Sequence, residues 1–427
     1  MNLLQLVRHS PFLRHNTVFF FGSVAVGALN YLYYPVLGRL LDPAAFGEVQ
    51  ALVSLFLQLA IFLSVFGLVT TNVVANYGDQ AKRNAVVLEL EKLALTLSLA
   101  FLLLVIAFQH QLRSFLQFDS TWPFIILAVA IVVSVPFTFR SAFLRGQQAF
   151  GATSVANIVG AAAKLLFSAI LVAIGLGTAG AIGGLVLAQA VAWGYAAWKA
   201  AQLGLVGQPS SSRWRLPDVR LLAPELKYGL LVFISSFVIT VQYSIDIVVV
   251  KHFFDAHTAG LYAGVASVAR IIFFLTASVA QVLMPSIKLT NPPGKNYHIA
   301  LRSGLLLVGV SLPVLLLFTF APSFIVGLLM GSAFKEAAHL LPQLSLAIFI
   351  ISILNLAVAY YLSLRRWGIA VVTLLGGIVT YALMAVRHDS LEEVISSLLI
   401  GSVCIVIALA IWIAGTRAKE LLWQSNN

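Results

Sequence analysis

The sequence predicts an all-α integral membrane protein with about 12 transmembrane helices, in two parallel six-helix halves around a central cavity. Composition is the first observation: 60% of the residues are hydrophobic, 10% are charged, and the mean hydropathy is +0.98. Soluble domains have about 45–50% apolar and about 25% charged residues. The second observation is that the apolar runs, such as "AFLLLVIAF", are continuous. The strands of a membrane β-barrel would instead alternate apolar and polar residues over about ten positions. The third is an internal repeat.

Twelve apolar segments are long enough to cross the roughly 30 Å of hydrocarbon, which takes about 20 helical residues. In chain order, the predicted spans are 16–38, 46–72, 86–108, 122–144, 152–174, 178–200, 228–250, 258–285, 299–320, 336–362, 367–386 and 393–415. The first run follows Arg8 and Arg14 as a signal peptide would. Because the run is long and lacks a convincing cleavage site, we interpret it as a retained helix. Pro136 and Pro313 are expected to kink the fourth and ninth helices.

The Lys and Arg residues orient these spans, because cytoplasmic loops of membrane proteins carry the excess of positive charge. With the N-terminus inside, most of the 26 basic residues fall in cytoplasmic segments. The outer segments receive only Arg39, Arg113, Lys251, Lys335 and Arg387. We therefore expect an even number of spans and both termini in the cytoplasm. The net charge of +11 marks orientation and not nucleic-acid binding, since it resides in short loops.

The repeat relates "GRLLDPAAFGEVQALVSL", from Gly38 to Leu55, to "KHFFDAHTAGLYAGVASV", from Lys251 to Val268. The pairs Asp42 and Asp255, Gly47 and Gly260, and Ser54 and Ser267 share one offset of 213 residues. In both halves the motif falls between the first and second helix, where an Asp favours helix initiation and a Gly permits close packing. Two halves that enter the membrane from the same side are parallel repeats.

The one long connection is rich in Ser, Pro and Arg and separates the halves. We expect an N-terminal half over 1–200, a cytoplasmic linker over 201–227 and a C-terminal half over 228–427.

Two cations lie near the middle of spans, where a charge costs about 2.5–3.5 kcal/mol on insertion scales and usually faces a cavity. Lys164 belongs to the fifth span and Arg270 to the eighth. Both lie on stripes of polar and small residues at helical spacing, which also contain Asn157 in the fifth span. We expect both cations to bind substrate; the alternative is that each is paired inside the protein, Arg270 with Asp246 and Lys164 with a carbonyl.

Further polar residues line the first, second and seventh spans: Asn30, Gln58 and Gln242. We expect them to bind substrate in the cavity, although such side chains also serve simply to hold transmembrane helices together. Asp246 is the one acidic residue well inside a span. It is a candidate for ion coupling, or it neutralises Arg270, Arg39 or Lys251. Arg39, at an outer helix end, either snorkels to the interface or reaches a ligand at the cavity mouth.

Signals for an enzyme are absent. The sequence has no glycine-rich phosphate loop, no HExxH motif, no metal-ligand spacing of histidines and no close pair of carboxylates within a span. We expect no catalytic residue, no metal and no cofactor.

The segments "NYLYYPVLGRLLDPAAFGEVQALVSL", "SIDIVVVKHFFDAHTAGLYAGVASVARI" and "FIVGLLMGSAFKEAAHLLPQLSL" resemble the Wzx-type oligosaccharide flippases, a polysaccharide-biosynthesis family of the multidrug/oligosaccharidyl-lipid/polysaccharide exporter superfamily. Gly38, Arg39, Leu40, Phe46 and Gly47 look like the family's first-loop signature. Asp246, Gly260, Tyr262 and Pro285 match its pattern around the seventh and eighth helices.

The resemblance implies two six-helix lobes, alternating access, and transfer of a polyprenyl-phosphate- or pyrophosphate-linked oligosaccharide from the cytoplasmic to the outer leaflet of the cell (inner) membrane. Its partners would be that lipid-linked oligosaccharide, membrane lipids and polysaccharide-assembly proteins, with no nucleic acid. Twelve spans leave no room for the two extra C-terminal helices of lipid II flippases. A multidrug or metabolite antiporter of the same superfamily is the alternative, and a membrane glycan polymerase or ligase is a third, disfavoured by the short outer loops.

Overall fold

The computed structural model describes residues 11–205, 223–288, 290–292 and 294–425, which contain helices and no strand. Most of the predicted linker lies outside these residues. The chain divides into two compact units, Met1–Leu230 and Leu231–Asn427. The boundaries predicted for the two halves and the cavity between them stay predictions, because each unit is described by itself.

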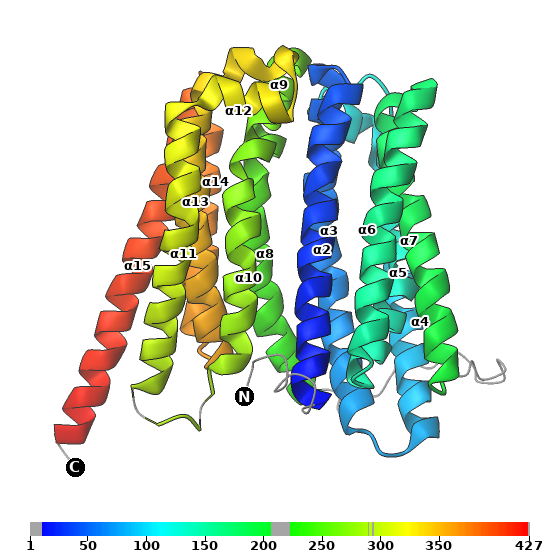
Figure 1. Cartoon of the computed structure of the whole chain (residues 1–427), viewed down its shortest axis with the longest axis vertical. Coiled ribbons are helices and arrows are strands. Elements are labelled where there is room, and N and C mark those ends of the chain that lie inside the picture. The colour runs from blue at the N-terminus through cyan, green and yellow to red at the C-terminus, as the bar shows by residue number, and fades with distance from the viewer. Residues whose placement is uncertain (1–10, 206–222, 289, 293, 426–427) are drawn as a thin grey trace. The chain divides into compact units, whose positions relative to one another are not determined.

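Unit 1 is a bundle of long helices that run side by side (Figure 1). They are α2 (Pro11–Leu40), α3 (Pro43–Asn76), α4 (Gln80–Phe115), α5 (Trp122–Gly146), α6 (Phe150–Leu171), the short η1 (Val172–Leu176) and α7 (Gly177–Gln202). Helix α7 packs on α5 and α6, α2 on α6, and α3 on α5. Phe139, Phe143 and Val135 of α5 are fully buried in a hydrophobic core to which α3, α4, α6 and α7 also contribute.

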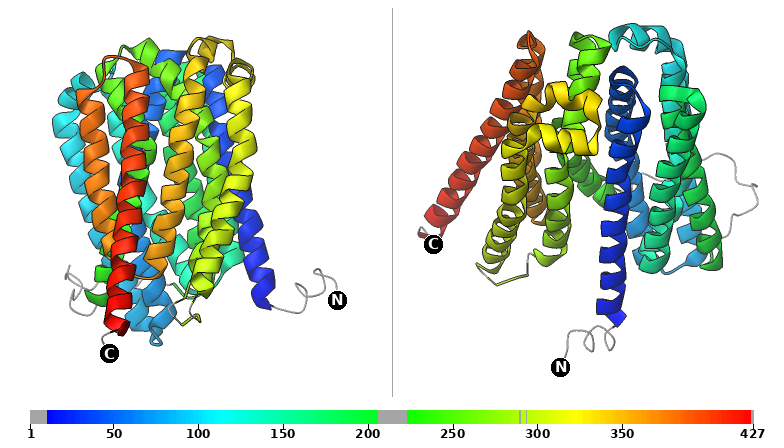
Figure 2. Two further views of the ribbon diagram at one scale, coloured as in Figure 1. Left: turned by 90° about the vertical axis from the view of Figure 1, so that its left-hand side faces the viewer. Right: turned by 45° about the horizontal axis from the view of Figure 1, so that its top comes forward.

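Unit 2 contains the remaining helices, beginning with α8 (Ala223–Phe253), which crosses the boundary between the units. The others are α9 (Ala256–Ala269), α10 (Ile271–Ser286), α11 (Lys295–Phe320), α12 (Pro322–Leu329), η2 (Ser332–Leu340), α13 (Leu341–Ser363), α14 (Gly368–Val386) and α15 (Leu391–Ser425). Helix α10 packs on α11 and α13, and α15 packs on α13 and α14. The short α12 runs across the ends of its neighbours instead of along them (Figures 1 and 2).

Ten helical stretches of the described residues are long and apolar enough to span a membrane. One of them, Phe150–Gln202, has 53 residues, or about 80 Å of helix at 1.5 Å per residue, enough for two crossings. It turns at Gly175 and Gly177, whose φ angles of 93° and 49° are ones that only glycine adopts freely. The predicted all-α membrane fold is confirmed, and the protein is a multi-pass membrane protein.

The repeated Asp motif forms matching helix caps in the two units. Asp42 accepts a hydrogen bond from the backbone N–H of Ala45 at the start of α3. Asp255 accepts from the N–H groups of His257 and Thr258 at the start of α9. Hydrogen bonds from Thr258 are the main reason that the pKa of Asp255 lies below its usual value. The capping role predicted from the repeat is therefore correct in both units.

Close helix packing in unit 1 depends on glycine. A Cβ atom on Gly184 of α7 would lie 2.2 Å from Oγ of Ser168 on α6. The Ser168 hydroxyl donates across the same contact to the carbonyl of Ala181, at 2.8 Å. Small residues at helix crossings let backbones approach in this way, so α6 and α7 pack closely at this contact.

Candidate functional site

Lys164 lies on α6 facing α2 in unit 1. Its Nζ donates a hydrogen bond to Oδ1 of Asn30 and lies 4.5 Å from the centre of the Tyr33 ring. Two predicted site residues, 134 positions apart in sequence, are thus brought into direct contact. The side chain of Lys164 is half-buried.

The charge of Lys164 has no carboxylate partner in the part of the chain that the structure describes. The ion pairs with an N···O distance of 4.0 Å or less among the described residues do not include Lys164. Within unit 1 they join Lys82 to Asp79, Lys92 to Glu89 and Arg140 to Glu91. An ammonium group has three N–H donors, and Asn30 uses one of them. The remaining two can bind an anion, and the face of the Tyr33 ring attracts the same cation.

Arg270 lies in unit 2 at the junction of α9 and α10, where the predicted single span divides into two helices. Its Nη2 donates to Oδ1 of Asp246 at 2.7 Å, and its Nε donates to the carbonyl of Tyr243 at 3.0 Å. The second carboxylate oxygen of Asp246 accepts from the hydroxyl of Tyr262 at 2.8 Å. Arg270 is 4% exposed and Asp246 is fully buried. The pairing considered from sequence is therefore present.

This pair changes what the two residues can do. A buried guanidinium beside a carboxylate carries little net charge toward an approaching anion, and neither group can leave the pair without uncovering a charge in a low-dielectric interior. Interrupted helices in transporters often mark positions where backbone and charge meet a transported group. In the conformation described, Arg270 binds Asp246.

The other predicted site residues lie in several places. Gln242 of α8 is fully buried, and its amide donates to the hydroxyl of Thr380 on α14 at 3.1 Å. Its carbonyl oxygen has no hydrogen-bond partner among the described residues. Gln58 on α3 and Asn157 on α6 are half-buried, and Arg39 is exposed at the end of α2. Asn157 lies two helical turns before Lys164, on the same face.

Three residues of these clusters were not on the predicted list of binding residues. Tyr33 and Tyr262 supply the ring under Lys164 and the hydroxyl on Asp246. Their signal in the sequence is the "NYLYYP" run and the "GLY" after Asp255, of which only the Gly belongs to the repeat. Both are equally typical of interface aromatics and helix packing. Thr380 had no signal, because a threonine in an apolar run is common in transmembrane helices.

An ion pair between α4 and α5 was also not predicted. Arg140 donates to Glu91 at 2.6 Å, and both side chains are largely buried at 19% and 14% exposure. The pair lies inside unit 1 and neutralises itself, so it serves helix packing.

The family model described as "Polysaccharide biosynthesis protein" matches residues 13–289, more than half of the chain. The chain belongs to the polysaccharide biosynthesis protein family. The match includes all eight predicted site residues, from Asn30 to Arg270. No curated protein sequence matches this chain.

Solved structures show which fold this family member adopts. An inward-facing multidrug resistance MATE family transporter of the MOP superfamily is similar with a TM-score of 0.71 at 14% identity, over 96% of this chain and 100% of that one. The lipid II flippase MurJ in an inward closed conformation is similar with a TM-score of 0.72 at 12% identity, over 94% and 87%. The MATE multidrug transporter DinF-BH has a TM-score of 0.66 at 15% identity, over 94% of both chains. At these identities the likeness shows a shared transporter fold.

Proposed function

We propose that this protein flips a lipid-linked oligosaccharide, joined to its polyprenyl carrier by a phosphate or pyrophosphate, from the cytoplasmic to the outer leaflet. Alternating access of the two halves carries the movement, in the inner membrane with both termini in the cytoplasm. The observation that carries this proposal is Lys164, a cation within a spanning helix with two unused N–H donors and no carboxylate partner among the described residues. A fixed positive charge in hydrocarbon is costly unless an anion uses it.

The family supports this choice of substrate. Its description names polysaccharide biosynthesis, and one protein of the same fold is a lipid II flippase. Other proteins of that fold are multidrug transporters, which makes antiport of a drug or metabolite the alternative. A half-buried, unneutralised lysine disfavours cationic drugs at that position and favours a phosphate group.

Each predicted site residue receives a role under this proposal. Lys164 and Arg39 attract the phosphate-sugar head group, and Arg270 joins them when its pair with Asp246 opens. The amide side chains of Asn30, Gln58, Gln242 and Asn157 bind sugar hydroxyls. Asp246, released from Arg270, takes up the coupling ion. The protein carries no catalytic step, and polysaccharide-assembly proteins would receive its product.

The test is complementation in a host that lacks its own copy of this protein and therefore makes no surface polysaccharide. Lys164→Ala removes one charge-assisted contact, worth about 1.5–3 kcal/mol, and should lower polysaccharide export about tenfold or more. Lys164→Arg should retain much of it. The matched control is Lys82→Ala, whose side chain is 80% exposed and should not matter. Export at the wild-type level by Lys164→Ala, at equal protein amount in the membrane, would refute the role of this cation.

A further inference from the structure

One face of α5 is polar at helical spacing and ends in a cation. It consists of Ser134, Thr138, Ser141 and Arg145. This face reaches α3 at Gly67, where an added Cβ would lie 3.3 Å from Cγ2 of Thr138 and 3.4 Å from Nη2 of Arg145. Arg145 follows the last residue of the fourth predicted span, so its sequence position indicates a loop cation. The structure instead places its charge against a second spanning helix.

The side chain of Arg145 turns back into the spanning segment. A long side chain on a helix leans toward the N-terminus of that helix, which for Arg145 is the direction into the membrane. Its Nη1 donates to Oγ of Ser141 at 3.3 Å. Ser141 lies three residues, or about 4.5 Å, before the end of its predicted span at 144, and Gly67 lies five residues, or about 7.5 Å, before the end of its span at 72. Both helices therefore place the guanidinium group inside the predicted edge of the hydrocarbon.

The charge of Arg145 is not neutralised within the part of the chain that the structure describes. The ion pairs there do not include it, whereas Arg140 on the same helix is paired with Glu91 at 2.6 Å. A guanidinium group has five N–H donors, and Ser141 accepts from one of them. The partner is a hydroxyl and not one of the free carbonyls at the end of α5, so Arg145 does not serve as a helix cap. The side chain is half-buried, which leaves an anion access to it.

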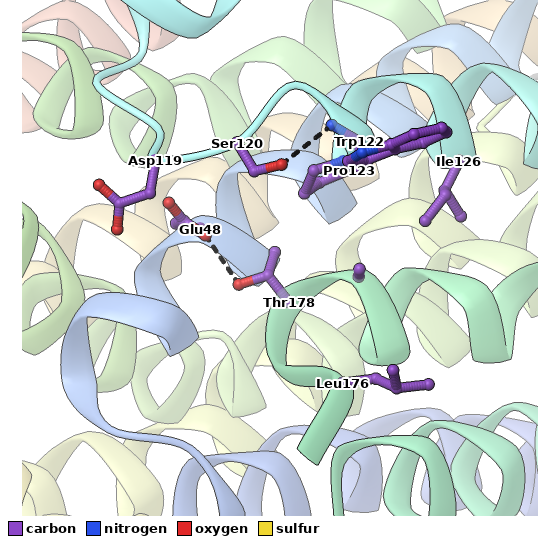
Figure 3. A pocket seen from close by; sticks show the side chains of 9 residues that line it. Glu48, Asp119, Ser120, Trp122, Pro123, Ile126, Leu176 and Thr178 are labelled. Atoms are coloured by element: carbon purple, nitrogen blue, oxygen red, sulfur yellow. Dashed lines mark hydrogen bonds between the residues drawn. The ribbon is translucent and has the colours of Figure 1, made fainter. Parts of the chain in front are cut away.

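The position and the chemistry of Arg145 fit a phosphate group that is attached to a lipid. The planar fork of a guanidinium matches two phosphate oxygens. At this level, between hydrocarbon and head groups, a lipid-borne phosphate is already present, whereas a soluble anion would first have to leave water. The other end of unit 1 offers no such group: its pocket of about 370 Å³ is lined by Glu48 and Asp119, and its lining contains no Lys, Arg or His (Figure 3).

Unit 1 thus holds two cations, at two levels, without a carboxylate partner among the described residues. Lys164 lies near the middle of its span, and the Arg145 guanidinium lies near the proposed cytoplasmic end. A bulk phospholipid stays at head-group level and has no use for the deeper cation, whereas a phosphate that crosses the membrane passes both levels. We infer that Arg145 binds the phosphate or pyrophosphate of the lipid-linked substrate as it enters from the cytoplasmic leaflet. This role rests on the proposed flipping function and adds to it the residue that binds the substrate first.

The test is a binding measurement on the full chain purified in detergent and stripped of lipid. Native mass spectrometry compares a polyprenyl pyrophosphate with the same polyprenol lacking phosphate and with dioleoyl phosphatidylglycerol. All variants are made in the wild-type and in the Lys164→Ala protein, so that binding at the deeper cation does not hide the change. Arg145→Gln removes one charge-assisted contact and should bind the pyrophosphate at least tenfold more weakly. Arg145→Lys keeps the charge without the fork and should lose less. The control Arg302→Gln changes an exposed arginine of unit 2 and should behave as its parent.

Three results would overturn the inference: equal binding of the pyrophosphate by Arg145→Gln and its parent in the Lys164→Ala protein, polyprenol binding as tightly as the pyrophosphate, or displacement of the pyrophosphate by an equal concentration of phosphatidylglycerol. The last result would assign the arginine to bulk anionic lipid. A flipping assay separates this inference from the proposed function. A wild-type protein that binds the pyrophosphate through Arg145 but does not move it would refute the function and support the site. Rapid flipping with unchanged binding in Arg145→Gln would refute the site alone.

Discussion

The buried pair of Arg270 and Asp246 allows a quantitative prediction for unit 2. Asp246→Asn removes the charge that neutralises Arg270 and weakens two short hydrogen bonds, one from Nη2 of Arg270 at 2.7 Å and one from the Tyr262 hydroxyl at 2.8 Å. Neither side chain can turn to solvent, since Arg270 is 4% exposed and Asp246 is fully buried.

The size of the effect follows from what is left behind. Removing one partner of a buried ion pair costs about 3–5 kcal/mol, because the other charge stays buried without compensation. For a domain of about 200 residues, 1 kcal/mol shifts the melting temperature by about 2–4 °C. We therefore expect Asp246→Asn to lower the apparent melting temperature of the purified protein by roughly 6–20 °C.

A second variant separates the ion pair from simple damage to the core. Asp246→Asn with Arg270→Met removes both charges, and replacing a buried pair by apolar or neutral groups is often close to neutral. The double variant should thus recover most of the stability that Asp246→Asn loses. Thermal unfolding in detergent, followed by tryptophan fluorescence, measures all variants. A double variant as unstable as Asp246→Asn, or a single variant as stable as wild type, would refute the reasoning.

Three further predictions concern the contact between α6 and α7 and the N-terminal cap of α9. Gly184→Ala should destabilise unit 1 by about 1–3 kcal/mol, because the added Cβ would lie 2.2 Å from Oγ of Ser168. The control in thermal unfolding is Gly194→Ala, where an added Cβ would have no other atom within 4 Å. Asp255→Ala should cost about 1 kcal/mol, the usual worth of an N-cap, and a loss far below this would contradict the capping role. Because hydrogen bonds lower the pKa of Asp255 in the folded state, its contribution is present above the unfolded pKa of about 3.9 and disappears as the pH falls through the folded pKa. The difference in stability between wild type and Asp255→Ala should therefore vanish in acid, as paired melts across pH would reveal.

Much of the fold follows from hydropathy, because crossing a bilayer requires about 20 apolar residues whatever their neighbours are. Each of the twelve predicted spans coincides with a helical segment of the described residues. The interruptions are what hydropathy missed. Arg270 divides the eighth span into α9 and α10, and α12 and η2 precede α13. A change in backbone direction within an apolar run leaves the composition unchanged, so a window average cannot detect it.

The site was predictable as a set of polar stripes but not as a set of contacts. Lys164 and Arg270 stood out because charges in spans are rare. The hydrogen bond from Lys164 to Asn30 depends on how α2 packs against α6. The two residues are 134 positions apart in the sequence, and helical periodicity predicts contacts only between residues a few positions apart. The sequence left open whether Arg270 is paired or free to bind substrate; burial of Asp246 next to it decides for the pair in this conformation.

The most direct test of the central claim is a flipping measurement with purified protein in liposomes. A fluorescent oligosaccharide on polyprenyl pyrophosphate is placed in both leaflets, and a membrane-impermeant quencher reports how fast the protected fraction becomes accessible. The account predicts rapid exchange with the wild-type protein and with Lys82→Ala, and at least a tenfold slower rate with Lys164→Ala. Exchange by the wild-type protein no faster than in protein-free liposomes, under an imposed proton or sodium gradient of either direction, would contradict it.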